Sequence, residues 1–269
     1  GCLQPLATPQ RRARAEARVA EAARLWGAGR VRILPADAAP GWIAPEAAAF
    51  GLLHDDLTAR LDPPATCRAL LAACRARDVC YLPGTEVTAL GDGGVHTASG
   101  FVPAGAVVVA AGTGSFRLIT APGLRSGGGV KGQAMLLGAA ATGQPVIHAD
   151  DIFIVAHDDG TVGLGSTTER DWTDPRATDA ALDALHDRAV ALCPALRGVP
   201  VLRRWAGLRP RAEGRQPMVG ALPGRSGVAV CTGGYKIGFA IGHLAGAAAV
   251  AAALGERPEL PESYAPARS

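Results

Sequence analysis

The chain has 269 residues, 48% of them apolar and 19% charged, a balance that is typical of a globular protein and excludes a largely disordered chain. The formal net charge is only +3, and apart from Lys131 and Lys236 the basic residues are dispersed arginines, which argues against a nucleic-acid-binding surface. The one dense basic run, residues 11–14, shares a predicted helix with Glu16 and Glu21, so we interpret it as a solvated helix face.

The first predicted element is a helix that the chain enters near Thr8 and Pro9 and leaves at Gly27. Thr8 suits the N-cap and Pro9 the first helical position. The side expected to be buried carries Val19, Ala22, Leu25 and Trp26. Residues 30–61 are short apolar pieces separated by prolines and glycines, which indicates an irregular, loop-rich sheet region.

A second helix is predicted to start at Asp62-Pro63, with apolar residues at helical spacing. Three strand candidates follow at 86–90, 95–97 and 101–102, and their close turns predict an antiparallel meander. Residues 106–112 form a continuous apolar run that ends in small residues. Such a run is typical of a central strand covered on both faces, and its small residues allow a ligand to approach.

Strand patterning returns over 131–137, 146–149, 152–156 and 161–165, with a hairpin turn at Asp158-Asp159-Gly160. A helix capped at Asp174-Pro175 is expected to bury Leu182, Leu185, Ala189 and Leu192 and to end at Pro194. The remaining predicted elements are a strand from Val201, a strand at 228–232 and an Ala-rich helix over about 237–254. The tail from Gly255 is expected to be loose.

The six cysteines form no C-x-x-C pair or common zinc pattern, and the six histidines form no metal-binding pair, so no metal site is expected. Cys67 and Cys74, seven residues apart on one helical face, are predicted to be small buried side chains. A reduced, cytoplasmic setting follows as the default. There is no signal peptide, and the longest apolar run, 239–254, is too short to span a bilayer. The start at Gly1, without methionine, suggests a trimmed or excised chain.

The most informative stretch lies between Trp205 and Gly238. Within it a strand, then Gly233-Gly234, then a helix predict an anion site, because unpaired amides and the helix dipole point over such a turn. Glycine at a strand–helix junction can also serve tight packing alone. Lys236 in the turn can be a surface lysine, but a cation is disfavoured at a helix N-terminus, which favours an anionic partner.

Arg209 lies between apolar residues and Pro210, and two interpretations stay open for it. Its planar guanidinium can clamp a substrate carboxylate through two hydrogen bonds. Alternatively it can form an internal salt bridge, for which Glu213 is the nearest candidate. His148 and His157 bracket a predicted strand pair and can line a pocket, although satisfied structural histidines are commoner.

The order of these features resembles the FAD-dependent amine oxidoreductases of the D-amino-acid oxidase superfamily, nearest to glycine oxidase and sarcosine oxidase-like members. The resemblance covers nearly the whole chain, and it rests on segments that are each weak but occur in the family's order: Gly1–Pro5, Leu61–Pro63, Glu86–Thr88, Val108–Gly112 with Ser115, Val130–Gln133, Gly163–Thr167, and Trp205–Pro210 with Glu213, Gly214 and Pro217.

The resemblance implies which residues bind the substrate and the cofactor. Arg209 would bind the substrate carboxylate, and Lys236 would act in substrate or oxygen chemistry. The amides of the Gly233–Gly238 turn would face the flavin ring. The expected reaction is oxidation of a small amino acid or N-alkyl amine by hydride transfer to flavin N5, followed by imine hydrolysis. The cofactor-binding residues would be Gly1, Val87, Ala110, Ala111, Gly112, Gly207, Gly233, Gly234, Tyr235, Ile237 and Gly238.

The expected fold is α/β, with a Rossmann-like FAD-binding domain (1–28, 60–120 and 206–269) interleaved with an antiparallel-sheet substrate domain (29–59 and 121–205). The family's amino-terminal strand with G-x-G-x-x-G is absent from this sequence. The alternative function is therefore a non-catalytic or split flavoprotein subunit that requires a partner chain for that segment. No nucleic-acid partner is expected, and a homo-oligomer is compatible with the sequence.

Overall fold

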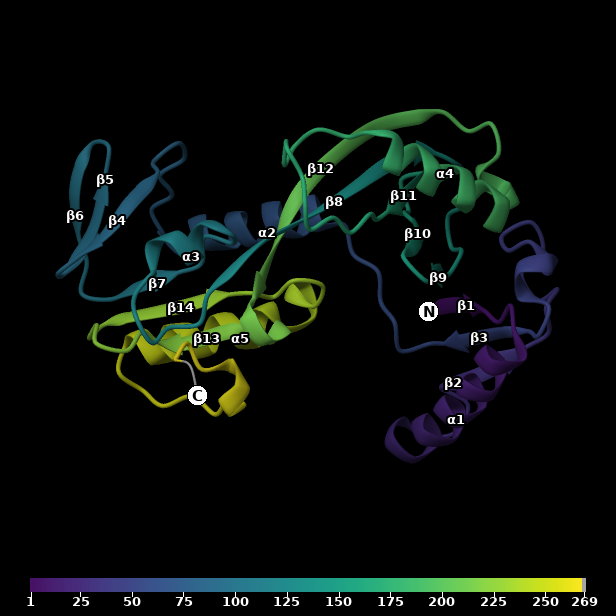
Figure 1. Ribbon diagram of the computed structural model, residues 1–269, viewed down its shortest axis with the longest axis horizontal. Coiled ribbons are helices and arrows are strands. Elements are labelled where there is room, and N and C mark those ends of the chain that lie inside the picture. Colours follow the sequence, from purple (N-terminus) through teal and green to yellow (C-terminus); the bar gives the residue numbers. More distant parts are fainter. Residues whose placement is uncertain (268–269) are drawn as a thin grey trace. The chain divides into compact units, whose positions relative to one another are not determined.

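The computed structural model describes residues 1–267, which form two compact units (Figure 1). Unit 1 contains residues 1–78, 132–169 and 173–207, and unit 2 contains 79–131, 170–172 and the residues from 208 onward. The α/β fold expected from the sequence is confirmed. The division into FAD-binding and substrate domains stays a prediction, since the compact units follow contacts rather than ligands and are bounded at other residues.

Unit 1 contains most of an eight-stranded sheet in the order β12-β8-β11-β10-β9-β1-β3-β2, of which residues 127–131 of β8 and 208–212 of β12 belong to unit 2. β1 runs parallel to β9, whereas the pairs β1–β3, β2–β3, β9–β10, β10–β11 and β8–β11 are antiparallel. The strands are β1 (Cys2–Pro5), β2 (Val31–Leu34), β3 (Leu52–Asp55), β8 (Gly127–Gly138), β9 (Val146–Ala149), β10 (Ile152–Ala156), β11 (Thr161–Gly165) and β12 (Val201–Ala212). The bounds predicted for β9, β10 and β11 are confirmed.

The helices of unit 1 begin at side-chain caps. Thr8 accepts a hydrogen bond from Arg11 N at 3.2 Å, and Asp62 accepts one from Ala65 N at 2.9 Å, as predicted. The cap predicted at Asp174 is wrong, because α4 starts at Asp179, which accepts from Ala181 N at 3.0 Å. The helical segments are α1 (Pro9–Trp26), η1 (Pro45–Ala48), α2 (Pro63–Arg75), α4 (Ala180–Leu192) and η2 (Pro194–Leu196).

The eight-stranded sheet has one covered and one partly open face. The predicted stripe of α4 is buried with Met135, Ile147 and Ile154 on the covered face. On the other face Leu6, Val31 and Leu53 of the β1–β3 region pack with α1. The side chains of β10 on this second face, Phe153 and Val155, are only partly covered.

Two predictions about helix burial are wrong. Leu25 and Trp26 at the end of α1 are exposed and do not belong to the cluster that packs this helix against the sheet. Helix α2 has no buried residue, so Cys67 and Cys74 are exposed rather than packed. An amphipathic pattern predicts a helix and its apolar face, but it does not tell what covers that face.

Unit 2 contains two three-stranded sheets, ordered β4-β5-β6 and β13-β14-β7. The predicted meander is confirmed in the first of them. β7, expected to be a central strand, is covered on both faces but lies at the end of its sheet among the described residues. The elements are β4 (Val87–Gly91), β5 (Gly94–Thr97), β6 (Gly100–Pro103), β7 (Val107–Val109), α3 (Gly114–Leu118), η3 (Glu213–Arg215), β13 (Met218–Ala221), β14 (Val228–Thr232), α5 (Gly238–Ala253) and η4 (Glu262–Tyr264).

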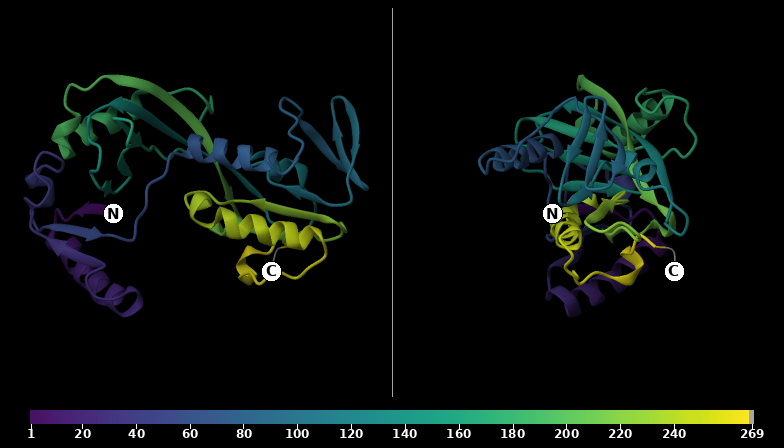
Figure 2. Two further views of the ribbon diagram at one scale, coloured as in Figure 1. Left: turned by 180° about the vertical axis from the view of Figure 1, so that it is seen from behind. Right: turned by 90° about the vertical axis from the view of Figure 1, so that its left-hand side faces the viewer.

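Helix α5 lies along β13 and β14 (Figure 2). Its buried alanines pack with Val219. The tail that follows is not loose as predicted. Leu260 and Tyr264 pack against the same cluster, and Arg125 N donates to Pro266 O at 2.8 Å. Within residues 1–267, no helix has both the length and the apolar character needed to cross a membrane. The same residues hold no group of three or more metal-ligating side chains.

Candidate active site

The candidate site in unit 2 forms where two parallel strands end side by side. β14 pairs in parallel with β7, so that Val228 lies opposite Val107 and Val230 opposite Val109. The segments that leave their carboxyl ends are residues 110–112 and the glycine turn, by which we mean residues 233–238. Ligands of open α/β sheets bind at such strand ends, and the two predicted cofactor-binding segments therefore meet in one place.

One buried hydroxyl group joins the two strand ends, and a second one holds the segment after β7. Thr232 Oγ1 donates to Gly112 O at 2.7 Å, and Ser115 Oγ accepts from Ala111 N at 2.9 Å. Ser115 and Thr232 are both buried, so these bonds are protected from water. Ala110 and Ala111 are themselves exposed, which leaves their backbone accessible to a ligand.

The glycine turn lies directly on the end of β12 and the start of β13. A Cβ atom at Gly233 would approach Ala212 Cβ to 2.9 Å and Met218 N to 3.4 Å, and the residue has φ 74°. A Cβ atom at Gly234 would come within 2.9 Å of Gly238 Cα. Both positions therefore require glycine, because a side chain would collide with backbone or with a buried neighbour.

The turn presents hydrogen-bond donors. Tyr235 N donates to Pro210 O at 3.0 Å and Ile237 N donates to Gly234 O at 2.8 Å. The amides of Gly234 and Lys236 have no acceptor within residues 1–267, and the turn leads into the first turn of α5. Free amides near a helix N-terminus can donate hydrogen bonds to ring atoms on which negative charge develops. The turn therefore fits the pyrimidine side of a flavin.

Lys236 belongs to this turn, and Arg209 lies on β12 beside Pro210, which accepts a hydrogen bond from the turn. Lys236 is exposed, has no carboxylate partner in the part of the chain that is described, and its Nζ lies 5.7 Å from the centre of the Tyr235 ring. Arg209 is half-buried on β12, next to Pro210, whose carbonyl holds the turn. The Glu213 carboxylate accepts from Ser126 N at 3.4 Å and Ser126 Oγ at 3.2 Å. The roles proposed for Arg209 and Lys236 stay predictions.

The other residues predicted to bind the cofactor belong to neither of these two strand ends. Val87 is paired with Thr97 in the meander of unit 2. Gly1 and Gly207 belong to unit 1, where Gly1 O accepts a hydrogen bond from Val146 N at 3.0 Å. Their roles toward a cofactor also stay predictions.

A pocket of about 460 Å³ lies on the partly open sheet face of unit 1 and was not predicted from the sequence. Its walls come from β1, β3, β9, β10 and the segment after β3, and no local pattern connects these pieces. His148 lines it as suggested, whereas His157 does not. The pocket is lined by both apolar and polar side chains, a combination that suits a small ligand. Among its lining residues are Cys2, Gln4, Arg18, Asp55, Leu61, Val146, His148, Phe153 and Val155.

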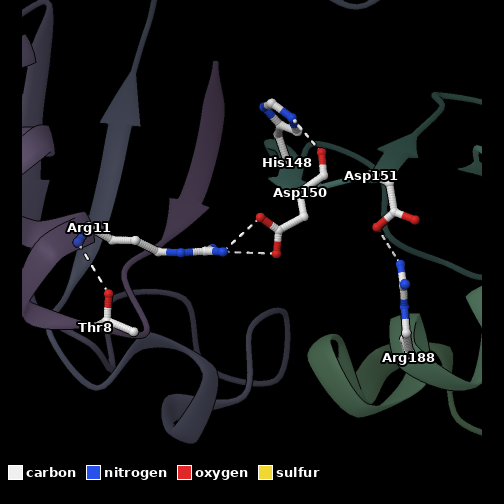
Figure 3. Close-up of polar contacts among 6 residues, drawn as sticks. All are labelled: Thr8, Arg11, His148, Asp150, Asp151 and Arg188. Carbon is white, nitrogen blue, oxygen red and sulfur yellow. Dashed lines mark hydrogen bonds and ion pairs between the residues drawn. The ribbon is translucent and has the colours of Figure 1, made fainter.

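Arginines from two helices hold the β9–β10 turn beside this pocket (Figure 3). Arg11 Nη2 of α1 contacts both carboxylate oxygens of Asp150 at 2.7 and 2.9 Å, and Arg188 of α4 pairs with Asp151. Asp150 has φ 56°, a conformation that aspartate tolerates in turns. The hairpin carries His148 and Phe153, whose rings stack with centroids 4.2 Å apart, so these contacts shape the pocket wall.

Cysteine reactivity follows from burial. Burial raises the pKa of Cys2, which lines the pocket, to about 11 and that of Cys193 to about 12, and it also raises the pKa of Cys231. Because the thiolate is the nucleophile and a raised pKa lowers its fraction at about pH 8, these three thiols are expected to alkylate slowly. The exposed Cys67, Cys74 and Cys80 should alkylate quickly.

Peptide mapping by mass spectrometry after timed labelling with iodoacetamide would measure this order. Unfolded protein, in which all six thiols should react alike, is the control. Labelling of Cys2 at the rate of Cys67 in the folded protein would contradict the expectation.

The chain is similar in sequence to known FAD-dependent oxidoreductases. The sequence family DAO, described as FAD dependent oxidoreductase, matches residues 1–252. Glycine oxidase from Pseudomonas putida is 36% identical over 150 residues, which are 55% of this chain and 41% of that protein. The chain thus spans less than half the length of that relative.

Two solved structures share the fold. Glycine oxidase from Geobacillus kaustophilus superimposes with a TM-score of 0.88 and 23% identity over 100% of this chain and 75% of that one. Iminodiacetate oxidase from Chelativorans sp. BNC1 gives a TM-score of 0.87 and 25% identity over 99% and 75%. The alignment with the Geobacillus structure covers the whole chain and therefore includes the strand ends and the glycine turn described above.

Proposed function

Because the chain belongs to the DAO family of FAD-dependent oxidoreductases, we propose that it oxidises a small amino acid or an N-alkyl amine with FAD as cofactor. The observation that carries the proposal is the glycine turn at the carboxyl ends of β7 and β14, where the amides of Gly234 and Lys236 have no acceptor among residues 1–267. The names of the relatives, glycine oxidase and iminodiacetate oxidase, support the substrate class.

Each part of the site would have one task. When bound, FAD supplies an acceptor for the hydride that leaves the substrate carbon next to nitrogen. The free amides of the glycine turn would hold the ring edge where negative charge develops. Residues 110–112 offer exposed backbone at the neighbouring strand end. Arg209 would hold the substrate carboxylate in two hydrogen bonds, so that catalysis rests on positioning rather than on an acid–base residue.

Spectroscopy tests the proposal directly. Protein that includes any upstream coding sequence should acquire the visible absorption of bound flavin on addition of FAD. Anaerobic addition of glycine, sarcosine or D-alanine should then bleach it, because the substrate reduces the ring. Riboflavin, which lacks the adenylate, serves as a control for nonspecific uptake. Protein that stays colourless after addition of FAD would refute the proposal.

A second candidate is a flavoprotein subunit that works only with a partner chain. The observation that favours it is apolar surface in unit 2. β7 has one strand neighbour among the described residues, and α5 exposes Leu244, Val250 and Leu254. A strand and helix from another polypeptide could cover this surface.

The genomic sequence upstream of Gly1 separates the two candidates. An in-frame G-x-G-x-x-G about forty residues earlier, the length of one βαβ unit, would favour the single-chain enzyme. A separate small reading frame with that motif would favour the subunit. In that case co-expression, and not expression alone, should yield yellow protein.

A further inference from the structure

The side chain of Arg125 is an unusual cross-link in unit 2, because its partners are backbone carbonyls from two separate segments. Its guanidinium donates to five carbonyl oxygens, those of Gln216 at 2.8 Å, Ser263 at 2.9 Å, Pro217 at 3.1 Å, Ala265 at 3.3 Å and Glu213. The five acceptors lie on residues 213–217 and 263–265, far apart in sequence. No other residue type offers so many donors in one rigid plane.

The backbone around Arg125 strengthens the same junction. Arg125 N donates to Pro266 O at 2.8 Å, Leu124 forms a bridge with Ala267, and Glu213 N donates to Ser126 O at 2.9 Å. Burial lowers the pKa of Arg125, and the nearby Glu213 partly offsets this. The group nevertheless stays charged, since an arginine is not deprotonated in proteins. The carbonyl dipoles therefore meet a permanent positive charge.

The segment 213–217, whose carbonyl groups accept hydrogen bonds from Arg125, connects the two residues against which the glycine turn packs. Residues 213–217 include Gly214 at φ 76° and Arg215 at φ 67°, and the latter conformation disfavours any residue with a side chain. The segment is bounded by Ala212 and Met218, the two residues against which Gly233 packs. Its shape therefore sets where the backbone of the glycine turn lies.

We propose that Arg125 is a positioning residue for the glycine turn. By joining residues 213–217 to the C-terminal segment 263–267, it fixes the backbone against which the turn packs, and thereby the position of the free amides of Gly234 and Lys236. Without its guanidinium, five carbonyls would lose their donor and the left-handed pair 214–215 would relax. The proposal rests on the proposed function only where it relates these amides to a flavin. The mechanical link between Arg125 and the turn stands without it.

Hydrogen exchange in the full chain tests the link. Arg125→Gln is expected to speed amide exchange about tenfold or more at Glu213, Tyr235 and Ile237, whose amides have backbone acceptors, because each lost charged hydrogen bond is substantial. Amides of β14 at 228–232 should keep their rates. Arg125→Lys, with three donors and the same charge, should fall between Gln and the native residue. Arg225→Gln is the matched control, since Arg225 makes one long bond, to Leu90 O at 3.4 Å.

A second readout concerns the cofactor. If FAD binds the native protein, its dissociation constant should rise about tenfold in Arg125→Gln, partly recover in Arg125→Lys, and stay constant in Arg225→Gln. Faster exchange spread evenly over β14 and the turn in Arg125→Gln would show a general stability role and overturn the proposal, as would unchanged exchange at Tyr235 and Ile237. A native protein that fails to bind FAD would refute the proposed function, and the exchange rates alone would then decide whether Arg125 positions the turn.

Discussion

Replacing Arg209 with alanine is expected to lower kcat/KM for amino-acid substrates by about 10²- to 10³-fold while FAD stays bound. Loss of a charged hydrogen-bonding partner in a desolvated site costs roughly 2–5 kcal/mol, and each 1.4 kcal/mol is tenfold. Steady-state kinetics measure the loss, and the flavin spectrum checks retention of the cofactor. Arg203→Ala, at an exposed position on the same strand, is the control.

A substrate without a carboxylate sharpens this experiment. If Arg209 clamps the carboxylate, turnover of a simple N-alkyl amine should be the same in native protein and in Arg209→Ala. If Arg209→Ala oxidised amino acids at the native rate, Arg209 would not be part of the substrate site. Equal losses with both substrates would favour the internal salt bridge as its role.

Gly233→Ala is expected to destabilise unit 2 by about 2–5 kcal/mol and to abolish FAD binding. An alanine at φ 74° costs about 1–2 kcal/mol for the left-handed backbone, and overpacking against Ala212 and Met218 adds roughly 1–3 kcal/mol. Chemical denaturation followed by circular dichroism measures the stability, and titration with FAD measures the binding.

The chain offers a matched control for this substitution. Gly224 also has φ 74°, but a Cβ atom there would have no neighbour within 4 Å. Gly224→Ala should therefore show the backbone cost alone and leave FAD binding intact. If both variants lose the same stability and both bind FAD, close packing of the glycine turn has no role in the site.

Much of the local structure could be predicted because its causes are local. Thr8 and Asp62 cap helices with their own side chains, and Asp159 accepts from Thr161 N at 3.0 Å in the predicted hairpin. The error at α4 has a non-local cause. Asp179 accepts from Gln133 Nε2 at 2.8 Å, and Asp179 N donates to Gln133 Oε1 at 2.8 Å. A residue 46 positions away thereby helps to select the cap.

The candidate site divides in the same way. The strand, the glycine pair and the following helix are neighbours in sequence, so the glycine turn was predictable, whereas the roles of Arg209 and Lys236 stay predictions. The pocket of unit 1 was not, because it is assembled from strands of distant parts of the chain. Arg125 gave no signal either, since its partners are main-chain carbonyls, which have no sequence signature.

The amino-acid sequence by itself determined the α/β class, most strands and helices, and the order of motifs that marks the family. It did so because capping, hydrophobic periodicity and glycine conformation act over a few residues. Only the tertiary structure decided which apolar faces are covered, that the tail is fastened by Arg125, and that Gly233 packs against Ala212 and Met218. Those outcomes depend on contacts between distant segments, whose geometry no local pattern encodes.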